Sequence, residues 1–281
     1  TGLKAARTPT ERLQKMSTNP NDVVELDGHR DSVDASALTI RQVAPGAAAR
    51  WLREGWAAML RSPGVSLFYG SLCAAVGFGV VLLGRAMPGL TVKFVIVLLM
   101  LGPFLAAGLY VTARRHLAGD AAGIAKSFAL DGQRRSSLGL FGLFLIFVVS
   151  TWMMATVVLF AIKVTALAPT SAGYVTALGG GLDPLMTLFL IGSGALLAAA
   201  VFVSSVVAVP LIVDRDAGPI AAVHASWRAV IANPRPMLAW AGVVVGLMLL
   251  GAVTAFLGMV LIFPLLGFGS WYAYREVIDA D

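Results

Sequence analysis

Chemically reactive side chains are scarce in this sequence. It contains one cysteine and three histidines, and only 13% of its 281 residues are charged, about half of the ~25% typical of a soluble domain. The single cysteine, Cys73, excludes an internal disulfide framework and a cysteine metal cluster. The P-loop, HExxH and GxSxG motifs are all missing. These absences argue against most classes of enzyme.

Ionisable residues are also missing from the middle of every long apolar stretch. Such residues mark proton relays and ion pathways in membranes, and a membrane haem needs axial ligands, usually histidine, inside the bundle. His29 precedes the apolar stretches, while His116 and His224 lie at their edges. We therefore expect no catalytic, metal or cofactor site in this chain, and a membrane enzyme is a less favoured alternative.

Long apolar runs are abundant instead. Hydrophobic residues make up 58% of the chain, and a helix needs ~20 apolar residues to cross a ~30 Å hydrocarbon core. The closing run, Met237–Tyr274, has 38 residues and would extend about 57 Å as one helix, so we expect two short spans with a turn near Gly251–Thr254. Four other runs are Ser66–Gly84, Phe94–Ala113, Leu138–Ile162 and Leu185–Val213. The sequence predicts an all-α integral membrane protein with six transmembrane helices; five spans plus an interfacial C-terminal helix is the alternative.

An amphipathic segment followed by an apolar hairpin occurs three times. Ile220–Pro234 aligns with Ala49–Pro63 at an offset of 171 residues, and Ala118–Leu130 aligns with Ala217–Ala229 at an offset of 99. A fixed-period repeat indicates that one supersecondary unit is used repeatedly. We therefore expect a flexible cytoplasmic tail over residues 1–46, with a short strand-like stretch at Leu38–Val43, and a membrane domain over 47–281. Its repeat units run over about 47–115, 118–215 and 217–276.

The basic residues predict the orientation. With six spans, the outer loops hold only Arg85, Lys93 and Lys163, and the other 18 of the 21 Lys and Arg residues collect on one face. Because Lys and Arg resist translocation, that face is expected to be cytoplasmic, with both termini inside. The net charge of +6 then suits anionic lipid head groups. Nucleic acid is not an expected partner, since no aromatic-basic binding motif accompanies the charge.

The amphipathic segments carry one aromatic residue each at aligned positions. Trp56, Phe128 and Trp227 occupy these positions, and the first and third lie within apolar stripes at helical spacing. Such helices suit the membrane interface, and we expect the three aromatic side chains to face lipid or the hairpins; a partner-docking surface is the alternative. Trp271, near the C-terminus, is a further expected lipid or partner contact.

A basic cluster flanks the second amphipathic segment. We expect its side chains to hold anionic lipid phosphates or an acidic loop of a partner, since each basic group near an anionic surface contributes about 1 kcal/mol. A solvated loop with no bound partner is the alternative. The cluster consists of Arg114, Arg115, Lys126, Arg134 and Arg135.

Residues suited to close helix packing lie within the spans. Gly242 and Gly246 form a GxxxG motif, and small residues let helix backbones approach closely in lipid. Pro103, Pro210 and Pro264 lie in the three returning spans, where each is expected to kink the helix for packing.

Several short motifs together resemble an uncharacterised bacterial family of polytopic membrane proteins. They are the Trp51–Trp56 run, Gly102-Pro103, Arg114-Arg115, Pro210 with Asp214-Arg215, Asn233-Pro234, and Pro264–Gly267 with Trp271 and Tyr274-Arg275. The resemblance covers residues 38–278 and implies a domain of unknown function in the bacterial inner membrane. Some members of the family are described as cytochrome c oxidase subunits. This chain has Phe268 where the closing motif of the family has histidine, which weakens any ligand role there.

Two functions from different classes follow from these observations. The favoured one is a non-catalytic integral membrane subunit, or an assembly factor, bound to other membrane subunits. The resemblance implies that these belong to a respiratory complex of the cytochrome oxidase type. The alternative is a small-solute transporter or channel built from the three hairpins, since transporters often contain internal repeats. A polar, water-lined cavity would favour transport, and a dry, packed bundle would favour a subunit.

Overall fold

The computed structural model describes residues 38–86, 102, 105–120, 123–167 and 184–278. All of them belong to one compact unit that runs from Val33 to Asp281. The described part of the chain is helical, apart from turns and one isolated antiparallel bridge between Ile40 and Ile278. The all-α class predicted from the sequence is therefore confirmed for these residues.

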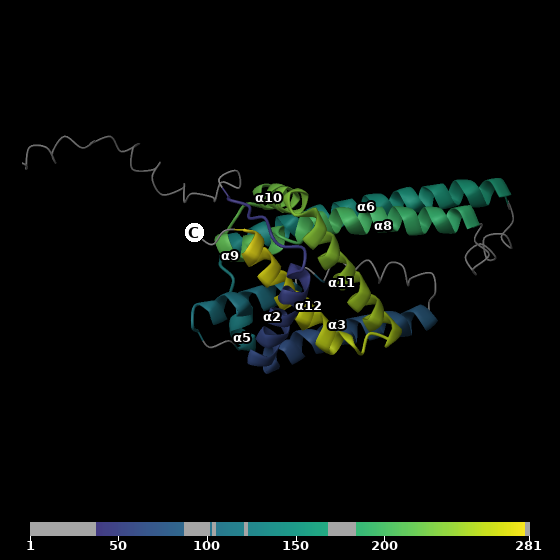
Figure 1. Ribbon diagram of the computed structural model, residues 1–281. Helices are drawn as coiled ribbons and strands as arrows, with labels where there is room; N and C mark the ends of the chain where they lie inside the picture. The colour runs from purple at the N-terminus through teal and green to yellow at the C-terminus, as the bar shows by residue number, and fades with distance from the viewer. Residues whose placement is uncertain (1–37, 87–101, 103–104, 121–122, 168–183, 279–281) are drawn as a thin grey trace, which may run out of the picture. The chain divides into compact units, whose positions relative to one another are not determined.

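In the described part of the chain, nine helices have defined bounds. Figure 1 labels them, and residues 105–117 are helical as well. Proline begins α3, α10 and α11, where its fixed φ suits the first turn and its missing N–H costs no hydrogen bond. The helices are α2 (Ala47–Arg61), α3 (Pro63–Ala86), α5 (Ile124–Ser127), α6 (Gly132–Leu167), α8 (Pro184–Ser205), α9 (Ala208–Arg215), α10 (Pro219–Ala232), α11 (Pro234–Val253) and α12 (Met259–Val277).

Four segments in the described residues are long and apolar enough to cross a membrane: Pro63–Leu83, Gly132–Leu159, Gly192–Arg215 and Pro234–Val253. They agree with four of the expected spans. Half of the expected span Phe94–Ala113 lies outside the described residues, and residues 105–113 are helical. The closing run divides as expected, because α11 ends at Val253 and α12 begins at Met259. However, α12 is not among the four, so the six-span repeat architecture stays a prediction.

The core is built around α12, which packs against both α2 and α3. Glycines allow these helices to approach closely. A β-carbon on Gly55 of α2 would lie 2.7 Å from the Gly269 nitrogen, and one on Gly70 of α3 would overlap the Val260 carbonyl. Pro264 lacks the N–H that would bond this carbonyl in a regular helix. The crossing of α3 and α12 therefore occurs where α12 exposes the carbonyl oxygen of Val260.

The GxxxG motif does not contribute to this packing. Gly242 and Gly246 are exposed, and a β-carbon at either position would meet open space within the described structure. Instead, α11 packs through Pro236, Met237 and Trp240, all of them buried. Among the described residues the two glycines therefore pack against no other helix, since the larger side chains of α11 determine which of its faces is buried. Close packing of the motif against another helix stays a prediction.

The three prolines differ in what they do. Pro103 lies outside the described residues. Pro210 is buried in α9, and the break between α8 and α9 falls at Val206–Val207. That is where the ring of Pro210 would meet the carbonyl four residues earlier. Pro264 lies inside α12 without interrupting it. The kink expected from Pro210 is thus a full helix break, which lies four residues before the proline.

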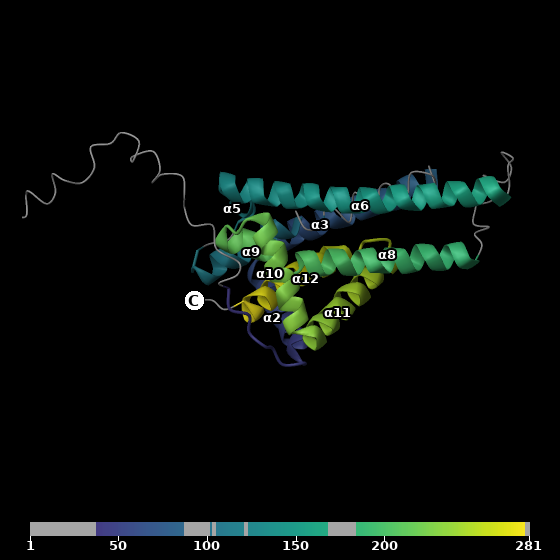
Figure 2. The same cartoon turned by 90° about the horizontal axis from the view of Figure 1, so that it is seen from above.

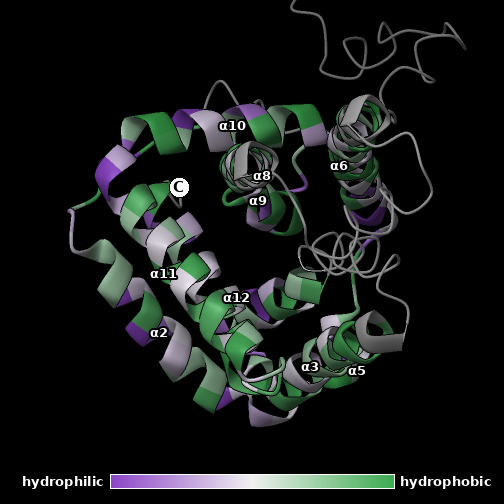
Figure 3. Ribbon diagram, turned by 90° about the vertical axis from the view of Figure 1, so that its right-hand side faces the viewer, coloured by the Kyte–Doolittle hydropathy of each residue, from purple (hydrophilic) through white to green (hydrophobic). Residues whose placement is uncertain are grey.

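The apolar helices α6 and α8 run along nearly the same axis, whereas α11 is oblique to them (Figures 1 and 2). α6 and α8 extend alongside each other (Figures 1 and 2), and Trp152 Nε1 donates to Ser193 Oγ across them at 3.2 Å. In Figure 3 these two helices are seen nearly end-on, whereas α10 runs across the view. α10 is therefore oriented across the spans, as expected for an amphipathic helix at a membrane surface.

Candidate functional site

The end of α9 is held by two arginines. Arg114 Nη1 donates to the Val213 carbonyl at 3.0 Å and to the Asp214 carbonyl at 3.5 Å, and Arg134 Nη2 donates to the Asp214 carbonyl at 3.4 Å. The last carbonyls of a helix lack partners within it and carry partial negative charge. The two arginines therefore cap the C-terminus of α9.

The side chain of Asp214 extends this site to α12. Tyr274 donates its hydroxyl proton to Asp214 Oδ2 at 2.9 Å, and Arg275 Nη1 lies 3.5 Å from the same oxygen. Asp214 thus connects α9 with α12 through its carboxylate, and with Arg114 and Arg134 through its carbonyl. We did not predict this role, although an acidic residue among many basic ones at a helix end was a usable signal.

The predicted basic cluster divides into two groups. Burial lowers the pKa of Arg114, and the nearby charge of Arg134 lowers it further. Arg134 also pairs with Asp131 at 2.6 Å, so both arginines are committed to contacts within the chain. The outer group consists of Arg115, which lies 3.8 Å from Asp120, and the exposed Lys126 and Arg135. Lipid or partner binding by this outer group stays a prediction.

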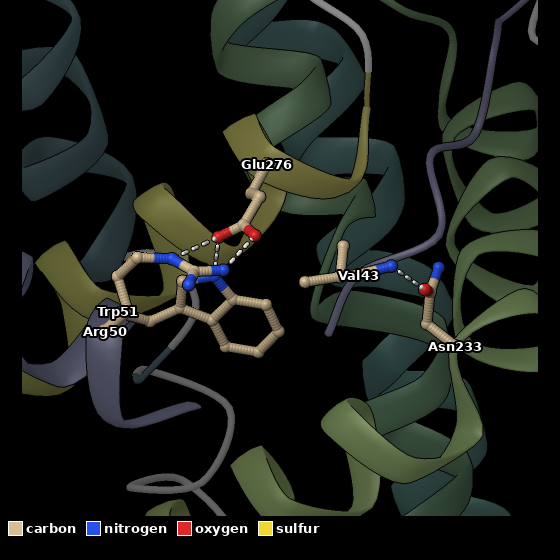
Figure 4. Close-up of polar contacts among 5 residues, drawn as sticks. All are labelled: Val43, Arg50, Trp51, Asn233 and Glu276. Atoms are coloured by element: carbon tan, nitrogen blue, oxygen red, sulfur yellow. Dashed lines mark hydrogen bonds and ion pairs between the residues drawn. The ribbon is translucent and has the colours of Figure 1, made fainter. Parts of the chain in front are cut away.

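A second polar site joins the ends of α2 and α12 (Figure 4). The Glu276 carboxylate accepts a hydrogen bond from Trp51 Nε1 at 2.7 Å and binds the Arg50 guanidinium through both oxygens. Trp51 is fully buried, with its ring edge-on to Trp240 at a centroid distance of 5.8 Å. Burial and the charge of Glu276 raise the pKa of the neighbouring Glu54. Sequence reasoning missed Glu276, which lies beyond the last apolar run.

Residues 40–43 are fixed to the membrane domain. Asn233 Oδ1 accepts from the Val43 N–H at 2.8 Å (Figure 4), and its Nδ2 donates to the Arg41 carbonyl at 2.9 Å. The Arg41 N–H donates to the Val277 carbonyl at 2.8 Å, next to the Ile40–Ile278 bridge. The expected end of the flexible tail at residue 46 is therefore too late, because Asn233 and α12 satisfy the backbone of this segment.

The three aligned aromatics have similar environments. Trp56, Phe128 and Trp227 are 46%, 53% and 45% exposed. A small buried residue precedes each of them: Gly55, Ser127 and Ser226. Within the described structure these three aromatic side chains lie at the surface, which fits their expected lipid-facing or partner-facing positions without testing what covers them.

Trp271 differs from the other aromatics. Trp271 is 0% exposed, and its ring stacks on that of Tyr110 at a centroid distance of 6.0 Å. The ring of Tyr274 lies tilted against it at 5.6 Å. The expected lipid or partner contact of Trp271 is therefore wrong, because α12 is a central helix and this face of it is covered by the rest of the chain.

The described residues contain no group of three or more His, Cys, Asp or Glu side chains that could hold a metal ion. His116 Nε2 lies 2.5 Å from Ser62 Oγ, and burial together with the charge of Arg61 lowers the pKa of His116. The contact between His116 and Ser62 joins the end of the 105–117 helix to the start of α3. Like Asp214 and Glu276, these two residues connect the ends of different helices.

These features define an α-helical membrane protein with several apolar helices, and comparison with known proteins supports this class. Residues 90–214 match the model of a family described as "predicted integral membrane protein (DUF2189)", a domain of unknown function. The match covers less than half of the chain and includes Arg114, Arg134 and Asp214. It confirms, for these residues, the resemblance to membrane proteins of unknown function. No curated protein and no solved structure gives a significant match.

Proposed function

We propose that this protein is a non-catalytic integral membrane subunit or assembly factor, and that α6 is its main contact with a larger complex. The single observation that carries the proposal is how little of α6 the rest of the chain covers. Only 17% of its apolar window is buried within the described structure, the lowest share of the four candidate spans, compared with 22% for α11, 44% for α3 and 50% for Gly192–Arg215.

The length and side chains of α6 support a protein partner. Its 36 residues extend about 54 Å, well beyond the ~30 Å hydrocarbon core, so a partner can contact it outside the bilayer as well. Large apolar side chains are exposed along it, Phe147 at 70% and Met154 at 65% among them. The oxidase-type complex implied by the resemblance is one candidate partner.

A photo-crosslinker placed on α6 tests this proposal in native membranes. We expect a crosslinker at Phe147 to capture one discrete membrane protein, whereas one at Leu145, which is 2% exposed, captures none. The captured protein should belong to a complex whose yield falls when this chain is deleted, while the turnover of each remaining complex is unchanged. Lipid adducts alone at Phe147, or unchanged yield of the captured complex after deletion, would reject the proposal.

We further propose six membrane crossings, arranged as three hairpins that all begin and end on one face. Two atoms in contact lie on the same side of a bilayer, so the chain between them crosses it an even number of times. Ser62, directly before α3, contacts His116 at the end of the 105–117 helix. Since α3 is apolar enough to cross, a returning span before His116 is required, as Phe94–Ala113 would supply.

Equivalent contacts support the other two hairpins. Arg134 in the first turn of α6 contacts Asp214 near the end of α9. Asn233, directly before α11, binds Arg41, whose N–H bonds Val277 at the end of α12. The third pair implies that α12 returns across the membrane after α11. Together with the distribution of basic residues, these contacts support cytoplasmic termini in a bacterial inner membrane.

A further inference from the structure

We infer that the outer faces of α2 and α10 form two matched anchors in the lipid head-group region, independent of any protein partner. The first anchor consists of Trp56 and Leu60, and the second of Ile220, Trp227 and Ile231. Each lies on a helix that leads directly into a candidate span through a sharp bend.

The two bends have nearly the same backbone geometry. Ser62, between α2 and α3, has φ −128° and ψ 59°, and Asn233, between α10 and α11, has φ −129° and ψ 54°. A proline follows each of them and begins the span. Because α3 and α11 are both apolar enough to cross the membrane, the helix before each bend has to lie close to where the span enters the bilayer.

The inner face of each helix is already covered. On α2 the buried residues include Trp51, Gly55 and Met59. On α10 they include Ala225 and Ala229. One face of each helix therefore packs on the protein, with large side chains on α2 and with small ones on α10.

The outer faces are apolar as well. Trp56 and Leu60 are 46% and 61% exposed, and side chains four residues apart lie on the same face of a helix. On α10, Ile220, Trp227 and Ile231 are 86%, 45% and 72% exposed. Their spacing of seven and then four residues also defines one face. Two short helices beside spans thus carry large apolar side chains on the face that the rest of the chain leaves uncovered.

The chemistry of these faces fits a lipid interface better than a protein. Tryptophan is enriched at the boundary between head groups and hydrocarbon. Exposed Arg53 and Arg61 accompany the first anchor, and exposed Arg235 accompanies the second, which suits anionic head groups. Trp227 Nε1 donates to Ser204 Oγ of α8 at 3.1 Å, so its polar edge is bonded within the protein. Each anchor has only two or three large side chains, far fewer than the ~20–30 residues per side of a stable protein interface.

Environment-sensitive fluorophores on single cysteines test this inference. The full-length chain with Cys73→Ala would carry Leu60→Cys or Ile231→Cys and be reconstituted into phosphatidylcholine vesicles with a minority of phosphatidylglycerol. Asp120→Cys, in an exposed turn, reports an aqueous site, and Phe147→Cys, on the exposed face of α6, reports a site in the membrane. Quenching by iodide in water is compared with quenching by lipids brominated near the head group or deep in the acyl chain.

We expect the probes at Leu60 and Ile231 to emit at shorter wavelength than the probe at Asp120. Iodide should also quench them much less than it quenches the probe at Asp120. Shallow brominated lipid should quench them more than deep brominated lipid does, and the probe at Phe147 should show the opposite order. Iodide quenching equal to that at Asp120 would overturn the inference by placing the anchors in water. Shielding from iodide and from both lipids would also overturn it, in favour of contact with a second copy of the chain.

Discussion

Replacing Gly70 by alanine is expected to destabilise the protein by about 3 kcal/mol or more, at the upper end of the cost of overpacking. The added methyl group would overlap the backbone carbonyl of Val260. A backbone atom in the first turn of α12 cannot move aside as a flexible side chain can, so α3 and α12 would have to separate. The effect is measured by heating both proteins in detergent and comparing the temperatures at which the folded fraction is lost.

Gly79→Ala is the matched control on the same helix. A β-carbon at Gly79 meets no atom within 4 Å, and alanine favours a helix by about 1 kcal/mol over glycine. We expect this variant to be as stable as the parent chain or more so. Equal stability of the Gly70→Ala and Gly79→Ala variants would contradict the close crossing of α3 and α12.

Replacing Glu276 by alanine should also have a large effect. Trp51 is 0% exposed and its indole N–H bonds to Glu276, so the substitution leaves a buried donor unpaired at a cost of about 1–3 kcal/mol. The Arg50 guanidinium loses its carboxylate partner in the same variant. Thermal unfolding in detergent, followed by the fluorescence of the buried tryptophans, measures the loss.

Glu276→Gln separates the two contributions. Its amide oxygen can still accept from the Trp51 indole, whereas the charge that pairs with Arg50 is lost. We expect most of the stability to return, because the pair with Arg50 is partly exposed to solvent and exposed ion pairs contribute little. If the glutamine variant is as unstable as the alanine variant, the Trp51 hydrogen bond is not the main contribution of Glu276.

The apolar helices could be predicted from the sequence because their signal is local. Apolar length located α3, α6, α8 and α11, and Pro63 and Pro234 are the first residues of α3 and α11. The break at Val206–Val207 follows from Pro210 by the same local sterics. These properties depend on neighbouring residues along the chain, which the sequence displays directly.

Contacts between distant residues could not be predicted in the same way. GxxxG at Gly242 pointed to close packing, yet the closest crossings use Gly55 and Gly70, because it is the position of α12 that decides which glycine meets a backbone. Trp271 and Trp56 are both aromatic residues near a span, but only the first lies on a central helix. For the same reason Asp214 and Glu276 could not be assigned their partners before the helices were placed.

The arrangement of three hairpins with all their bases on one face is the central claim, and reporter fusions test it most directly. A reporter active only in the periplasm and another active only in the cytoplasm are each fused after Gly119, Ala172 and Asp281. Six crossings with cytoplasmic termini predict that only the cytoplasmic reporter is active after Gly119 and Asp281, and only the periplasmic reporter after Ala172. Periplasmic activity after Gly119 or after Asp281 would contradict the closed hairpins.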